Sequence, residues 1–246
     1  MRTLQPQFKQ KSIRSYVIRS GRITPAQEKA LAEDWAVFGL DLHQGSAALT
    51  QAFPSPANEL VLEIGFGMGD SLLEMAEKNP AQNFIGIEVH VPGVGRLMSE
   101  ARKRKLQNLR IFCADAIDVL HDCIADGSLS RVQLYFPDPW HKSRHHKRRI
   151  VQPDFVDLVV QKLRTDGVLH MATDWEPYAE VMLEVASAHS QLTNMAGGAQ
   201  YSARPDYRPE TKFERRGENL GHVVHDLLFH KRARLCATAP PKADST

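Results

Sequence analysis

Acidic residues recur in the sequence where successive apolar runs end. Glu63, Glu88 and Asp115 close or directly follow the first three runs, and Asp138 and Asp174 follow the fourth and fifth. Carboxylates attract cations and accept hydrogen bonds from hydroxyl and amino groups. Solvation alone does not explain an acid at the end of all five of these runs, so we expect these side chains to contribute to one binding site.

A glycine-rich turn follows the first run. Gly65, Gly67 and Gly69 alternate with other residues directly after Glu63, and Asp70 could cap the helix that follows. Glycines let the backbone approach a ligand closely, but the dinucleotide-binding pattern needs its third glycine one residue later. Two carboxylates would also repel a pyrophosphate. The turn therefore favours a cationic nucleoside without phosphates, such as S-adenosylmethionine; a tight turn capped by Asp70 is the alternative.

Two further acids suit a nucleoside. Glu88 closes the second run about 20 residues beyond the glycine turn, the position from which an acid accepts hydrogen bonds from ribose hydroxyls. Asp115 follows the third run and could accept from the exocyclic amine of adenine. Each alone could be a solvated strand end, but with Glu63 they predict a nucleoside site.

The turn after the fourth run has the sequence FPDPW and ends at Trp140. Two prolines stiffen this turn and fix the carboxylate of Asp138. It differs from the Asn-Pro-Pro-aromatic arrangement expected of enzymes that methylate exocyclic amines, so a different nucleophile is expected. A proline-rich turn with a packed tryptophan is the structural alternative.

A strongly basic segment, HKSRHHKRR at 141–149, carries five cations and three histidines. Its proximity to Asp138 favours RNA phosphates as the partner, with an affinity that falls steeply with salt. A solvated loop and a targeting segment are the alternatives. His145 and His146 are adjacent rather than at metal-ligand spacing, so we expect phosphate contact and no metal.

Two polar loops complete the predicted rim. Thr173, Asp174 and Trp175 follow the fifth run, and TKFERR at 211–216 precedes the last one. They offer two carboxylates and an aromatic face, which reading an unstacked purine requires. Ordinary surface turns are the alternative.

The elements that must position these residues follow from the apolar pattern. Buried strands are expected at 60–64, 84–89, 109–114, 132–136, 168–173 and 222–231. Helical patterns occupy 70–79, 92–106, 116–122, 153–163 and 176–189. The alternation predicts a doubly wound α/β fold with a parallel sheet, to which the last strand adds antiparallel. Ligands bind such sheets at the carboxyl ends of the strands.

Composition agrees with one sizeable globular domain and an appendage. The chain has 246 residues, 42% hydrophobic and 24% charged, and 31 Lys and Arg against 29 Asp and Glu give a net charge of +2. Cys113, Cys123 and Cys236 lack ligand spacing, which fits a reducing compartment without structural zinc. No stretch has the 18 or more apolar residues of a membrane span, and no secretory signal is evident. We expect a cytoplasmic protein that does not contact membranes.

The N-terminal part is predicted to be an appendage. Six cations and no acid precede Gln27, and Thr24, Pro25 and Gln27 form a helix-start pattern. We expect residues 1–50 to be a basic arm with a capping helix, 51–231 to be the catalytic domain, and 232–246 to be a disordered tail.

Together these segments resemble one family. GRITPAQ at 21–27, LEIGFGMG at 62–69, CADA at 113–116, FPDPWHKSRHHKRR at 136–149, ATDW at 172–175 and TKFERRG at 211–217 occur in the order found in bacterial tRNA (guanine-N7-)-methyltransferases. The PDPW segment with its basic run and the TKFE segment are specific to that family, whereas the glycine turn indicates only the superfamily. The resemblance extends from Gly21 to Lys231.

The resemblance implies a seven-stranded Rossmann-like methyltransferase fold and methyl transfer from S-adenosylmethionine to N7 of guanine 46 in the variable loop of tRNA. It assigns the cofactor site to Glu63, Glu88, Asp115 and Asp138, and catalysis to Asp138. It assigns substrate binding to Lys142, Asp174, Thr211, Lys212, Phe213 and Glu214. It assigns RNA contact to Arg144, His145, His146, Lys147, Arg148 and Arg149.

Several alternatives stay open from the sequence. Asp138 with either Asp174 or Glu214 could accept from the guanine edge, and Phe213 or Trp140 could contact the ring. The rival functions are methylation of another RNA guanine, a non-catalytic RNA-binding module, a nicotinamide-dependent oxidoreductase and methylation of a small molecule. A monomer and a homodimer are both compatible with the sequence.

Overall fold

The computed structural model describes residues 13–17, 21–56, 58–210, 214 and 223–233. The predicted substrate residues Thr211, Lys212 and Phe213 lie outside these ranges, as do Cys236 and the tail from 234 onward.

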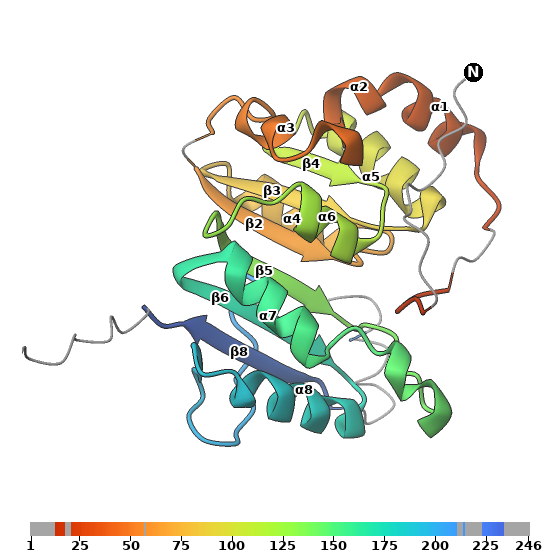
Figure 1. Ribbon diagram of the computed structural model, residues 1–246. Helices are drawn as coiled ribbons and strands as arrows, with labels where there is room; N and C mark the ends of the chain where they lie inside the picture. The colour runs from red at the N-terminus through yellow and green to blue at the C-terminus, as the bar shows by residue number, and fades with distance from the viewer. Residues whose placement is uncertain (1–12, 18–20, 57, 211–213, 215–222, 234–246) are drawn as a thin grey trace, which may run out of the picture.

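One sheet organises the described residues, and its order is β1-β4-β3-β2-β5-β6-β8-β7 (Figure 1). Its strands are β1 (Gly39–Leu40), β2 (Glu59–Ile64), β3 (Gln82–Ile87), β4 (Leu109–Phe112), β5 (Leu129–Tyr135), β6 (Leu163–Thr173), β7 (Leu192–Asn194) and β8 (His225–Lys231). Strands β1 to β6 pair in parallel, whereas β8 is antiparallel to both of its neighbours. The predicted fold class is confirmed, and the two-residue β1 adds an eighth strand at one edge.

Among the described residues, six longer helices cover the two faces of the sheet (Figure 1). One face carries α1 (Pro25–Glu33), α4 (Asp70–Lys78) and α5 (Val91–Lys103), and the other carries α6 (Ala116–Asp122), α7 (Pro153–Lys162) and α8 (Glu176–Ala188). Shorter helical segments are α2 (Trp35–Phe38), η1 (Leu42–Gln44), α3 (Ala47–Thr50) and η2 (Ser143–Arg148).

The strand sequences explain why both faces are covered. Successive side chains of a strand point to opposite faces, and Val61 of β2 belongs to the core under α4 and α5, whereas Leu62 belongs to the core under α6 and α7. Phe84 and Ile85 of β3 divide in the same way. Near-continuous apolar runs are therefore needed, as expected of a parallel sheet buried on both sides.

Helix α1 begins as the sequence predicts. Thr24 is the N-cap, its hydroxyl accepts from the Gln27 backbone N–H, and the Gln27 side chain accepts from the Thr24 backbone N–H. Pro25 occupies the first turn. The helix packs on α5 so closely that a Cβ on Gly95 would lie 2.9 Å from the Gln27 carbonyl oxygen.

Candidate functional site

The strand order reverses between β2 and β5, which pair with each other in parallel. This reversal is where open α/β sheets bind ligands, beyond the carboxyl ends of the strands. The predicted acids lie at these ends: Glu63 is the second-last residue of β2, Glu88 lies directly after β3, Asp115 shortly after β4, Asp138 after β5 and Asp174 directly after β6. The structure thus brings all five to the same edge of the sheet.

The glycine turn faces open space. Gly65 and Gly67 have φ values of 75° and 59°, and a Cβ on either residue would meet nothing within 4 Å. These conformations require glycine because other residues rarely adopt positive φ. Gly69 is the N-cap of α4 with φ 78°, so the expected cap at Asp70 is wrong: Asp70 lies in the first turn and pairs with Arg96 at 2.5 Å.

Glu88 fixes the shape of the glycine turn. Its Oε2 accepts from the Gly67 backbone N–H at 2.8 Å, and its Oε1 accepts from the backbone N–H groups of Val89 and His90 at 2.6 and 2.9 Å. A carboxylate has about four lone-pair sites, so Glu88 retains capacity for a hydroxyl donor.

Glu63 is a buried carboxyl group. Only 3% of its surface is exposed, and its Oε2 has no hydrogen-bond partner among the described residues. Burial, reinforced by the negative charge of Glu88, raises the pKa of Glu63 to about 8. An unpaired acid at this depth is destabilising unless a donor or a cation approaches it. The site is therefore suited to a positively charged ligand.

Asp115 lies at the edge of the site and also stabilises the start of a helix. It is the N-cap of α6, where its Oδ1 accepts from the Ile117 backbone N–H at 2.8 Å. Its Oδ2 accepts from the hydroxyl of Tyr16 at 3.2 Å. The carboxylate is thus held in one orientation from both sides.

The FPDPW turn is strained and braced. Phe136 and Trp140 are the first and last residues of this turn, and they have positive φ values of 50° and 47°. This conformation costs a non-glycine residue on the order of 1–3 kcal/mol. The Phe136 N–H donates to the Ala172 carbonyl at 2.8 Å, and Arg149 Nε donates to the Pro139 carbonyl at 2.9 Å. Asp138 is exposed at the centre of this turn. Strain held by surrounding structure is typical of a functional turn.

The basic run folds mainly into η2, and its cations divide into two groups. Lys142, Arg144 and Lys147 are exposed. Arg148 is half-buried against Trp140, with its guanidinium carbon 3.9 Å from the ring centre. Arg149 is 5% exposed and lies over the ring of Tyr178 at 4.7 Å. The first group can meet phosphates directly, whereas the second braces the protein.

The loop after β6 provides an exposed aromatic face. Trp175 is 39% exposed and packs edge to face with His141, ring centres 4.4 Å apart. Asp174, the preceding residue, is exposed. Thr173 is buried, and its Oγ1 accepts from the Trp175 backbone N–H at 3.2 Å.

Glu214 lies in a buried polar network. Both of its oxygens accept from the Arg208 guanidinium, at 2.6 and 2.7 Å, and Arg208 also donates to Asp226 of β8 at 2.8 Å. Asp226 Oδ1 lies 2.7 Å from His170 Nε2. The other ring nitrogen of His170 lies 3.0 Å from the hydroxyl of Tyr135, the last residue of β5. A guanine donor would therefore compete with Arg208 for Glu214.

Comparison with known proteins identifies the family. Residues 57–227 match the family model described as "Putative methyltransferase". The chain is 57% identical over 228 residues to a "tRNA (guanine-N(7)-)-methyltransferase" of Saccharophagus degradans, covering 93% of this chain and 99% of that protein. A protein of the same name from Alcanivorax borkumensis is also 57% identical, over 91% of this chain and 93% of its own. The chain belongs to the bacterial tRNA (guanine-N7-)-methyltransferase family.

This chain is thus a methyltransferase, and the expected family is confirmed. Among solved structures, that of the 16S rRNA methyltransferase KamB aligns with a TM-score of 0.49 at 14% identity, over 76% of this chain and 92% of that chain. That likeness is too distant to bear on function.

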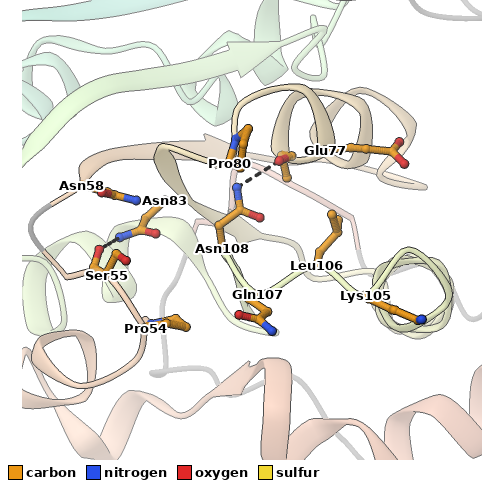
Figure 2. Close-up of a pocket in the computed structure, with 11 residues that line it drawn as sticks. Pro54, Ser55, Asn58, Glu77, Pro80, Asn83, Lys105, Leu106, Gln107 and Asn108 are labelled. Carbon is orange, nitrogen blue, oxygen red and sulfur yellow. Dashed lines mark hydrogen bonds between the residues drawn. The ribbon is translucent and has the colours of Figure 1, made fainter.

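The pocket in Figure 2 lies away from this site. It has a volume of about 280 Å³ and lies where β3 and β4 begin, at the amino edge of the sheet. Asn83 donates to the Ser55 carbonyl at 2.7 Å, and Asn108 donates to the Ala76 carbonyl at 2.9 Å (Figure 2). These amides tie loops of the methyltransferase together, and none of the predicted site residues lines the pocket.

Neither a membrane-spanning helix nor a cluster of metal ligands occurs in the described part of the methyltransferase. No helix in the ranges given above is long and apolar enough to cross a membrane. The same residues contain no group of three His, Cys, Asp or Glu side chains that could hold a metal ion, and Cys113 and Cys123 are buried free thiols.

Two residues that contact predicted site residues could not be identified from the sequence. Tyr16 reaches Asp115 from 99 residues away along the chain. Arg208 joins the predicted Glu214 to the sheet of the methyltransferase. A tyrosine in a basic arm and an arginine in a polar connection carry no periodic or spacing signal, so only the tertiary structure identifies their partners.

Proposed function

We propose that this protein transfers a methyl group from S-adenosylmethionine to N7 of guanine 46 in the variable loop of tRNA. The names of its relatives support tRNA and guanine N7, and the resemblance of the sequence motifs supports position 46. The observation that carries the proposal is the buried carboxyl of Glu63, whose Oε2 has no hydrogen-bond partner among the described residues, beside an open glycine turn at the same sheet edge as η2.

The residues at this edge fit a sulfonium nucleoside. Glu63 favours the cationic methionine end because its burial makes a nearby positive charge stabilising. Glu88 has remaining capacity for a ribose hydroxyl, and we assign the adenine amine to Asp115, whose carboxylate is held by the Ile117 N–H. The carboxylate of Glu88 lies against the glycine turn and would repel a pyrophosphate, which disfavours the nicotinamide alternative.

The proposed chemistry needs orientation more than proton transfer. When bound, the donor supplies an electrophilic methyl group to guanine N7, which already has a free lone pair and loses no proton. A general base is therefore unnecessary. Alignment of two bound reactants contributes up to about 7–11 kcal/mol in favourable systems. The braced turn around Asp138 is suited to this role because its backbone is held in one conformation.

We assign the reading of guanine to two exposed acids. Asp138 and Asp174 follow adjacent parallel strands, β5 and β6, and each can accept from N1–H or the 2-amino group. Adenine lacks this donor pair, so it would leave the carboxylates unpaired. Glu214 is the weaker candidate because Arg208 engages both of its oxygens.

The base ring and the RNA backbone have separate partners in this proposal. Trp175 offers the exposed ring face, whereas Trp140 is covered by Arg148. The phosphates are assigned first to Lys142, Arg144 and Lys147, with His145 and His146 beside them on η2. Thr211, Lys212 and Phe213 keep their predicted substrate role.

The remaining assignments belong to the same proposal. We place the protein in the cytoplasm, where its tRNA substrate is made, as a monomer or a homodimer. We retain residues 1–50 as an arm with a capping helix and 51–231 as the catalytic domain.

A direct assay tests the proposal. The full chain is incubated with an unmodified tRNA transcript and methyl-labelled S-adenosylmethionine, and the digested RNA is analysed for 7-methylguanosine. A transcript with adenosine at position 46 is the matched control. Label in 7-methylguanosine from the first transcript alone is the expected result.

Two other outcomes would favour the rivals. Equal labelling of both transcripts would assign the activity to another guanine. Binding of tRNA without any methyl incorporation would favour a non-catalytic RNA-binding module.

A further inference from the structure

A short segment of the N-terminal arm, residues 13–17, lies at the carboxyl edge of the sheet (Figure 1). It is remote from helix α1, which covers one face of the sheet. The segment contacts two parts of the site, the N-cap of α6 and the basic helix η2.

At η2, three side-chain hydrogen bonds hold the backbone of this segment. Trp140 Nε1 donates to the Ser15 carbonyl at 3.1 Å. Arg148 donates to the carbonyls of Arg14 and Tyr16, at 3.0 and 3.1 Å. The guanidinium of Arg148 also stacks on the Trp140 ring at 3.9 Å. Backbone acceptors spaced in this way fix where the Tyr16 side chain points.

At α6, the Tyr16 hydroxyl donates to Asp115 Oδ2 at 3.2 Å. Burial and then the charge of Asp115 raise the pKa of Tyr16, so its hydroxyl stays a donor at neutral pH. The other carboxylate oxygen is committed to the Ile117 N–H. Tyr16 therefore determines how the second oxygen is presented.

We propose that Tyr16 is a positioning residue for the adenosyl end of the cofactor, acting through Asp115, and that Trp140 and Arg148 set cofactor affinity by holding Tyr16 in place. This inference rests on the proposed function, because it takes Asp115 as an adenine acceptor. It adds a role to two residues of the PDPW segment and the basic run: their contact with the arm links the donor site to the RNA-facing helix.

The exposed and half-buried arginines of η2 provide a matched comparison. Arg144 and Arg148 carry the same charge on the same short helix, but Arg144 is exposed and donates to His145, whereas Arg148 holds the arm. Loss of either removes one positive charge near RNA. Only loss of Arg148 also releases Tyr16.

The test is calorimetric binding of S-adenosylhomocysteine to the full-length chain without RNA. We expect Tyr16→Phe to raise its Kd about tenfold, equivalent to about 1.4 kcal/mol. Trp140→Phe, which removes the N–H but keeps a ring for Arg148, and Arg148→Ala should raise the Kd in the same direction. Arg144→Ala should leave this Kd within twofold of wild type, although both arginine variants weaken tRNA binding.

A turnover measurement excludes a purely structural effect. In Tyr16→Phe the loss should lie in the KM for S-adenosylmethionine rather than in kcat or the KM for tRNA. A Tyr16→Phe protein with wild-type Kd, or equal Kd values for Arg148→Ala and Arg144→Ala, would overturn the inference. Tight S-adenosylhomocysteine binding by a wild-type chain that does not methylate tRNA would instead refute the proposed substrate, and the binding comparison would still decide the role of Tyr16.

Discussion

At the residue scale, Glu63 is an acid of the site whose charged form is disfavoured by burial. Its carboxyl lies at the end of a buried strand, and its Oε2 finds no partner in the described part of the chain. Isolated buried carboxyls respond by keeping their proton, which is why the pKa of Glu63 rises to about 8. The ligand-free site therefore stores a proton at neutral pH.

Ligand binding should release that proton. A sulfonium or ammonium group near Glu63 lowers its pKa, so binding at pH 7 should release close to one proton. The affinity for S-adenosylmethionine should consequently rise with pH and level off above about 8. Calorimetry in buffers of different ionisation enthalpy measures the release directly.

The matched variant for this experiment is Glu63→Gln. Its binding should be weaker and independent of proton uptake by the buffer, and a release equal to that of wild type would refute the assignment. The pH dependence of folding stability runs in the opposite direction. Because the pKa of Glu63 is raised in the folded chain, Glu63 stabilises the ligand-free chain below about pH 4.5. This contribution is lost as the pH rises toward 8.

Asp138 should be essential for turnover but not for folding. It is exposed in a turn that other residues brace, so Asp138→Asn should leave the unfolding free energy nearly unchanged. We expect kcat to fall about a hundredfold or more, the typical cost of removing one oriented polar group, while tRNA affinity is largely kept. Asp154→Asn, an equally exposed acid in the first turn of α7, is the control. Wild-type turnover in Asp138→Asn would remove this residue from the reaction.

Trp175 should act on the RNA alone. Stacking of a base on an exposed aromatic ring contributes about 1–3 kcal/mol. Trp175→Ala is expected to raise the Kd for tRNA about tenfold and to leave S-adenosylhomocysteine affinity unchanged. A filter-binding assay with wild type in parallel measures this, and equal tRNA affinity in the two proteins would contradict the stacking role.

At the element scale, the three exposed cations of the basic run, Lys142, Arg144 and Lys147, lie on η2 or directly before it. Lys142→Ala, Arg144→Ala and Lys147→Ala combined should raise the Kd for tRNA and reduce the slope of log K against log salt by about two to three, because each phosphate contact contributes about 0.7–0.9. Arg148 and Arg149 are left intact in this variant, so the bracing of the arm and of the FPDPW turn is unaffected.

A control variant separates local contact from net charge. Alanine at Lys29, Lys78 and Lys103 removes the same charge from helices α1, α4 and α5, away from η2. An identical change of slope in the two variants would mean that η2 is not the RNA-binding element.

Elements with a strong apolar period could be predicted closely from the sequence. The expected helix at 116–122 coincides with α6, and the expected helix at 153–163 differs from α7 by one residue. Strand β1, with two residues, is too short to produce a pattern. The acids of the site could be located because parallel strands end at one edge, whereas their partners could not, since Tyr16 and Arg208 depend on contacts between distant segments.

At the scale of the whole molecule, one buried network joins the connection before β8 to the centre of the sheet. Arg208 links Glu214 and Asp226, and Asp226 continues to His170 of β6. Burial lowers the pKa of His170, against the opposing effect of Asp226. A neutral His170 with its proton on Nε2 can donate to Asp226 and accept from Tyr135 on the other side.

Breaking this network should cost global stability. Arg208→Ala leaves two buried acids without their cation, and we expect it to lower the free energy of unfolding in urea by about 3–5 kcal/mol. Arg204 is the matched control: its side chain is 43% exposed and lies 3.6 Å from the same Glu214, so Arg204→Ala should cost about 0–1 kcal/mol. Similar losses of unfolding free energy in both variants would contradict a structural role of the network.

Strand β8 lies between β6 and β7 although it follows both in the chain. During translation, the edge of β6 that pairs with β8 therefore stays unpaired until residues 225–231 have left the ribosome. Unpaired edges recruit other chains, so nascent copies are exposed to aggregation over this interval and would benefit from a chaperone. A premature stop codon before β8 would make that exposure permanent, and such a truncated product should be cleared by proteolysis rather than accumulate as a partly active enzyme.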